Sequence, residues 1–148
     1  MERLHGTAIR LKYMTEGLED SVTTEQYDNK WSIKQEIGHL ADLEDLHIAR
    51  IRQLIAKQEV LEGWKVGNQQ THEANHNERT VGDLISDFEL KRQQFIDLLT
   101  NLEDDICHFA ALHPRLQVRM RPVDLAFFTA EHDDHHLAAI RQILYRLS

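Results

Sequence analysis

The chain has 148 residues, about the length of one domain, and can bury a core without covalent staples. Its formal net charge of −8, from 25 acidic and 17 basic residues, repels phosphate backbones. A single cysteine, Cys107, excludes an intramolecular disulfide, and no apolar run approaches the roughly 18 residues that span a bilayer. We therefore expect one cytoplasmic domain over residues 1–148 that binds neither nucleic acid nor membrane.

The first half of the chain contains two segments with the apolar periodicity of amphipathic helices. The first predicted helix runs from about Glu2 to Asp20. The second begins after Ser32, which forms a capping box with Gln35, and continues to about Lys57. These boundaries predict two helices of about 20 residues that each bury one face.

The second half of the chain repeats this pattern. A third helix begins after Thr80, with Asp83 as its capping partner, and continues to about Leu102. A fourth begins with Pro122, where the missing N–H costs little, and runs to the end of the chain. Because four such helices bury their apolar faces best against one another, we predict an all-α four-helix bundle without a sheet.

Three polar segments without periodicity connect the predicted helices. They cover residues 21–31, 58–79 and 103–121, and the last contains a turn at His113-Pro114. The middle segment is unusually long for a connection inside a compact domain. It is either a lid over a site or a crossover that allows neighbouring helices to run parallel.

Two of the ten histidines lie on the apolar stripe of the fourth helix. His132 and His136 are four residues apart, so both imidazoles can reach one point and offer two nitrogens to a metal ion. The alternative is a pair of core histidines with ordinary hydrogen-bond partners. Spacing favours the metal, because a buried neutral imidazole needs partners for both nitrogens. His135 flanks the stripe, and we expect it at the solvent or behind the ligands.

A third ligand must come from another helix, and the second helix offers His39, Glu44 and His47. On a helical wheel His47 lies on the stripe and His39 lies off its centre, so the pattern alone leaves the choice open. Glu44 and His47 also have the Glu-x-x-His spacing of carboxylate di-iron bundles. A second copy, at residues 73–76, falls in the predicted loop, which disfavours that hypothesis.

Two sequence motifs resemble those of the DinB-like (DinB/YfiT) superfamily. They are WSIKQEIGHLAD at residues 31–42 and AEHDDHHLAAIR at residues 130–141. The His113-Pro114 turn and the segment at residues 77–80 also stand where that family has similar residues. The resemblance therefore covers essentially the whole chain. It departs at Ala139, where many relatives have glutamine.

This resemblance implies a fold, a metal site and a class of chemistry. The fold is a four-helix bundle with DinB/YfiT-like up-down-down-up connectivity, often dimeric, in which residues 58–79 form the crossover. The implied metal ligands are His39, His132 and His136, which selects His39 over His47. Members of the family are known as metal-dependent hydrolases, and others are thiol-dependent transferases or isomerases in which the metal binds a low-molecular-weight thiol.

Three protein ligands leave one coordination position open, where a metal can activate water or hold a thiol as thiolate. We expect zinc or nickel, with iron, copper or manganese as alternatives, a small-molecule substrate and a homodimer. The catalytic group is unknown; the candidates are Asp133, Glu44, His47 and His135, each of which also fits a structural or solvated role. The alternative function is a non-catalytic metal- or ligand-binding dimeric bundle.

Overall fold

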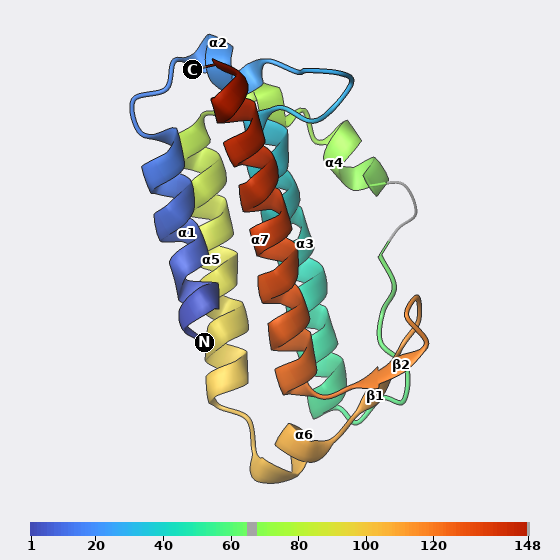
Figure 1. Cartoon of the computed structure of the whole chain (residues 1–148). Coiled ribbons are helices and arrows are strands. Elements are labelled where there is room, and N and C mark those ends of the chain that lie inside the picture. Colours follow the sequence, from blue (N-terminus) through green and yellow to red (C-terminus); the bar gives the residue numbers. More distant parts are fainter. Residues whose placement is uncertain (65–67, 148) are drawn as a thin grey trace.

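The computed structural model describes residues 1–64 and 68–147, and within them four long helices form a bundle (Figure 1). In Figure 1, α1 runs upwards from the N-terminus, α3 and α5 both run downwards, and α7 returns to the top. The predicted all-α bundle with up-down-down-up connectivity is therefore confirmed. The four helices are α1 Glu2–Thr15, α3 Ile33–Ile55, α5 Val81–Thr100 and α7 Pro122–Leu147.

Short elements fill the connections that the sequence left irregular. A two-stranded antiparallel hairpin pairs Ala111 with Met120 and His113 with Val118, so the expectation of no sheet is wrong here. Three residues per strand are too few for alternating polarity to stand out. The short elements are α2 Asp20–Thr24, α4 Gln69–Glu73, the 3-10 helix η2 His76–Glu78, α6 Asp104–His108, β1 Ala111–His113 and β2 Val118–Met120.

The predicted helix caps are present. Ser32 Oγ accepts a hydrogen bond from the Gln35 backbone N–H at 3.2 Å, and Gln35 Oε1 accepts one from the Ser32 N–H at 3.0 Å. Thr80 Oγ1 accepts from the backbone N–H of Asp83 at 3.0 Å, but the predicted reciprocal bond to the Asp83 side chain is not found among the described residues. These side chains satisfy N–H groups that have no partner inside the helix, which fixes where α3 and α5 begin.

The first helix is shorter than predicted. It ends at Thr15 rather than near Asp20, because Gly17 adopts a left-handed conformation with φ of +71°. Such a glycine is a common C-terminal stop signal for a helix. The chain then forms the separate helix α2 before it enters α3.

The bundle core consists of two apolar clusters with a polar layer between them. One cluster lies toward the hairpin and includes Leu54 and Phe95, and the other lies toward the opposite end and includes Leu40 and Phe88. The intervening buried polar side chains come from all four long helices. They are Thr7, Glu44, His47, Arg92 and Asp133.

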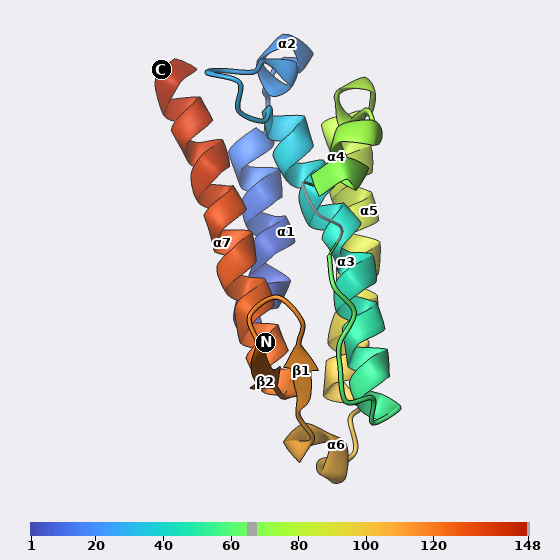
Figure 2. The same ribbon diagram turned by 90° about the vertical axis from the view of Figure 1, so that its right-hand side faces the viewer.

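The connection between α3 and α5 is a crossover that is fixed to α3 (Figure 2). Asp42 Oδ2 accepts the Thr71 hydroxyl at 2.9 Å, and His76 Nε2 lies 2.9 Å from the same oxygen. Gly38 makes this close approach possible, since a Cβ there would lie 2.3 Å from the His76 ring. Of the predicted loop 58–79, residues 65–67 lie outside the described residues, as does Ser148 at the end of the predicted fourth helix.

Among the described residues, no helix has both the length and the apolar character needed to cross a membrane.

Candidate metal centre

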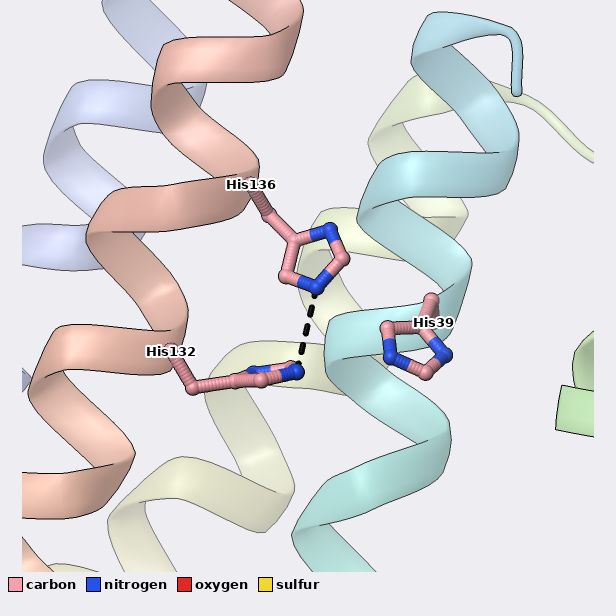
Figure 3. Close-up of side chains that lie close together, drawn as sticks. All are labelled: His39, His132 and His136. Carbon is pink, nitrogen blue, oxygen red and sulfur yellow. Dashed lines mark hydrogen bonds between the residues drawn. The ribbon is translucent and has the colours of Figure 1, made fainter. Parts of the chain in front are cut away.

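Three histidine rings converge between α3, which carries His39, and α7, which carries His132 and His136 (Figure 3). One ring nitrogen each from His39, His132 and His136 lies within 4.8 Å of the others. The Nε2 atoms of His132 and His136 are 3.1 Å apart. Two imidazole ligands on one zinc ion, at bond lengths of about 2.0–2.1 Å, stand about 2.9–3.4 Å apart, depending on the bond angle. The cluster therefore has the donor set for a divalent metal ion, the His132–His136 pair already has the ligand spacing, and His39 lies close enough to complete the site.

A hydrogen-bond relay orients His39. The Thr71 hydroxyl donates its single hydrogen to Asp42, so at the 2.9 Å contact it accepts from the Nδ1–H of His39. Nε2 of His39 is then unprotonated. Figure 3 shows that one ring nitrogen of His39 faces the other two histidines and that the second is turned away. The crossover thus supplies the group that sets the tautomer of a candidate ligand on α3.

His136 is held in the same way by a carboxylate. Its Nδ1 lies 2.5 Å from Glu36 Oε2, which accepts the Nδ1–H, so the lone pair on Nε2 can accept the Nε2–H of His132 at 3.1 Å (Figure 3). His132 differs, because its Nδ1 is buried and has no partner among the described residues. Lone pairs on Nε2 of both His39 and His136 therefore face a shared space, and a bound cation would satisfy them together in place of the hydrogen bond.

The environment keeps two of these imidazoles neutral. Burial, together with the neighbouring histidines, lowers the pKa of His39 to about 2. Burial, His136 and His135 lower the pKa of His132 to about 3. Because only a neutral imidazole binds a metal, both rings are in the ligating form at neutral pH.

A pocket of about 960 Å³ opens directly onto the three histidines. Its volume is at the upper end of the range for small-molecule sites. A second hollow of about 420 Å³ shares Trp31, Glu36 and His135 with it. The other described lining residues of the larger pocket are Leu43, His47, Arg50, Gly63, Trp64, Asn68, His113, Pro114, Arg115, Leu116 and Phe128.

Two of the predicted acid–base candidates lie in a buried ion-pair network and do not line the pocket. Glu44 Oε1 is 2.7 Å from Arg92 Nη2, and Asp133 Oδ2 is 2.6 Å from Arg92 Nη1. Thr7 also donates its hydroxyl to Asp133 at 2.8 Å. Burial raises the pKa of Glu44, although Arg92 opposes this shift. Because Arg92 occupies both carboxylates, they act as structural groups.

The same contacts show that the di-iron hypothesis is wrong. Glu44 binds a guanidinium with both oxygens, and His76 of the second Glu-x-x-His copy binds Asp42. Within the described ranges, the one group of metal-ligating side chains is the three-histidine cluster.

The remaining candidates, His47 and His135, both line the pocket outside the cluster. His47 is buried; its Nδ1 lies 3.4 Å from the Thr129 hydroxyl, and burial lowers its pKa well below the usual value. His135 is exposed, and its ring contacts the His136 ring edge-on with a centroid distance of 5.2 Å.

The side chains that orient the cluster were not predicted from the sequence. Glu36 and Asp42 stand three residues before and after His39, where helical geometry places them beside it. That spacing could have identified both. Thr71 carried no such signal, because only the path of the crossover brings it to His39.

Comparison with solved structures identifies the same fold in YfiT from Bacillus subtilis, described as a probable metal-dependent hydrolase with an unusual four-helix bundle topology. The two share a TM-score of 0.84 and 19% identity over 99% of this chain and 84% of that chain. A search of curated proteins found no match. The family model of the DinB superfamily matches residues 3–140, which is most of the chain. The chain therefore belongs to the DinB superfamily.

Proposed function

We propose that the protein is a metal-dependent hydrolase that acts on a small molecule, with His39, His132 and His136 as its metal ligands. The observation that carries this proposal is the convergence of three imidazoles at the wall of a substrate-sized pocket. A purely structural zinc site is closed by four protein ligands, whereas a catalytic site has three and an open position. The structure thus favours an enzyme over the non-catalytic bundle.

The chain's own residues prepare the site in two ways. Glu36 and Thr71 hold the Nδ1 hydrogens of His136 and His39, which directs both Nε2 lone pairs inward. Trp31 and Trp64 line the pocket beside the cluster and reduce its exposure to water. A divalent metal held by His39, His132 and His136 would supply Lewis acidity, with which it would lower the pKa of a bound water to about 7 and polarise a substrate oxygen.

For proton transfer we propose His135. It lines the pocket, contacts the His136 ring and is open to solvent, from which it can exchange protons. His47 is less suited because burial holds it neutral. A His135→Ala variant is therefore expected to keep its metal and lose turnover.

The second candidate function is transfer of a low-molecular-weight thiol. The observation that favours it is the second hollow beside the cluster, since a transfer reaction must bind two organic molecules. Turnover of model substrates by the zinc-loaded protein distinguishes the two functions. Metal-dependent acceleration of thioether formation from 2-mercaptoethanol and 1-chloro-2,4-dinitrobenzene, with release of chloride, supports thiol transfer, whereas hydrolysis of 4-nitrophenyl acetate without added thiol supports hydrolysis.

Cobalt substitution also tests the proposed function itself. Protein that is stripped with a chelator and reloaded with Co²⁺ should bind one ion per chain. In a separate competition experiment, the stripped protein should bind zinc or nickel in preference to manganese. Added acetohydroxamate should change the visible spectrum by entering the open position. A protein that binds no ion would contradict the proposal. A cobalt spectrum that acetohydroxamate leaves unchanged would contradict it in favour of a closed, non-catalytic site.

We further propose that the protein is a cytoplasmic homodimer. The family resemblance supports the dimer, and so do large exposed apolar side chains on α1 and α7, including Ile9, Tyr13, Val123 and Phe127. Sedimentation equilibrium should return twice the chain mass of 17.3 kDa. A single-chain mass at all concentrations would contradict the dimer.

A further inference from the structure

A buried arginine in the pocket wall forms no ion pair among the described residues, although the charge of the Glu62 carboxylate opposes the effect of burial on its pKa. Arg50 of α3 is only 3% exposed, and its one hydrogen bond among the described residues runs from Nε to the backbone carbonyl of Glu62 at 2.9 Å. Burial lowers its pKa to about 10, so the guanidinium remains charged at neutral pH. Arg92 is equally buried but binds two carboxylates. Because an unpaired buried charge is costly, Arg50 has unused capacity for an anion.

A second donor with unused capacity lines the same pocket. His113 of β1 accepts the Leu116 backbone N–H at Nδ1, at 3.2 Å, so the neutral ring carries its hydrogen on Nε2. Burial, Arg50 and Arg115 lower the pKa of His113, which keeps the ring neutral. Nε2 is buried and has no partner in the described parts of the chain. Arg50 and His113 thus both offer donors to the same pocket.

The pocket has the histidine cluster in one part and the donors Arg50 and His113 in another. Among its described lining residues the one carboxylate is Glu36, which His136 already occupies. Arg50 stands eleven residues after His39 on α3, roughly 16 Å farther along the helix axis. Leu43 and Phe128 line the pocket as apolar residues. The histidine cluster and the two donors, the cationic Arg50 and the neutral His113, thus belong to different parts of one elongated pocket.

We propose that Arg50 and His113 form a subsite for an anionic group, such as a carboxylate, on an elongated and partly apolar substrate. The anion binds the guanidinium and the Nε2–H, while the reactive bond lies at the histidine cluster. This inference rests on the proposed function, because it takes the pocket as the substrate site.

Tryptophan fluorescence tests the subsite without any need for turnover. The chain has two tryptophans, Trp31 and Trp64, and both line the pocket. The probes are 4-phenylbutanoate and its neutral amide, titrated into metal-loaded and chelator-treated protein. We expect the carboxylate to bind at least about tenfold more tightly than the amide, as a charge-assisted hydrogen bond predicts. Arg50→Gln should abolish this preference and leave the affinity for the amide unchanged.

Three further variants serve as controls. His113→Phe should weaken carboxylate binding several-fold, and Arg50→Lys should retain part of it because the charge remains. Arg115→Gln, on an exposed side chain at the same wall, should have little effect. If Arg50→Gln fails to fold, as judged by circular dichroism, Arg50→Lys and His113→Phe decide the question by the same criterion.

The inference is overturned if the wild type binds acid and amide equally, or if the preference survives Arg50→Gln. It is also overturned if the preference depends on the metal and not on Arg50, since the acid then binds the metal. The proposed function fails separately. In that case the protein retains no metal, yet the chelator-treated form keeps an Arg50-dependent preference for the acid.

Discussion

Helices α3 and α7 each contribute to two buried polar groups, and the two groups differ in how completely they are satisfied. Arg92 binds Glu44 and Asp133 and also donates to the Leu4 backbone carbonyl, so this network is closed. His132 is the chain neighbour of Asp133 but points to the histidine cluster, where its Nδ1 has no partner in the described structure. The described lining of the larger pocket includes the three histidines and none of the three charged residues of the network. Residue type and burial therefore do not identify a site, whereas unmet bonding capacity beside a pocket does.

The largest effect is expected from a substitution that removes the cation from the buried ion-pair network. Arg92→Met leaves Glu44 and Asp133 buried without a cation, and loss of one partner of a buried pair costs about 3–5 kcal/mol of unfolding free energy. Urea denaturation measures the loss. The control is Lys12→Met, which removes the exposed ion pair with Glu89 and should have a far smaller effect. Equal destabilisation by the two variants would show that the network is not a structural unit.

The residues behind the ligands should affect metal binding more than folding. Glu36→Leu and Thr71→Val remove the acceptors for Nδ1–H of His136 and His39, and each should weaken metal affinity about 10–100-fold. Competition with a chromophoric chelator measures the affinity. His135→Gln is the matched control because it lies beside the cluster without bonding a ligand nitrogen. Unchanged affinity in both variants would contradict an orienting role.

These predictions use features that the sequence reveals to different degrees. The caps at Ser32 and Thr80 and the spacing of His132 and His136 are local, so they could be predicted directly. The choice of His39 over His47 could not be predicted from the helical wheel, because a wheel assumes that a helix buries only one face. In the structure α3 is covered by α5, α7 and the crossover, so polar residues such as Asp42 are buried off the apolar stripe.

Long-range partners account for the other differences. Glu44 was a candidate metal ligand because of its Glu-x-x-His spacing to His47. Its actual partner, Arg92, lies 48 residues away on another helix, so the sequence did not reveal it. Arg50 and His113 meet at the pocket only because the hairpin packs beside α3. No periodicity within one segment contains that information, and the family resemblance supplied the ligand set but not these contacts.

Acid should destabilise the metal-free protein through the histidine cluster. The pKa of His39 is lowered to about 2 and that of His132 to about 3, against about 6.5 in the unfolded chain. The unfolded state therefore binds more protons below pH 6.5, and the folded state loses stability as pH falls from 6.5 toward 3. Urea midpoints of chelator-treated protein between pH 7 and pH 5 measure the effect. His132→Gln should reduce the slope, and an unchanged slope would contradict this assignment.

The central claim is that this bundle binds one divalent metal through His39, His132 and His136. Elemental analysis of the purified His39→Ala and His47→Ala variants tests it most directly, because both residues are buried on α3 and line the same pocket. The structure predicts that His39→Ala, like His132→Ala and His136→Ala, loses the metal, while His47→Ala and His135→Ala retain one ion per chain. If His47→Ala loses the metal and His39→Ala keeps it, or if His132→Ala keeps a full complement, the three-histidine site is wrong.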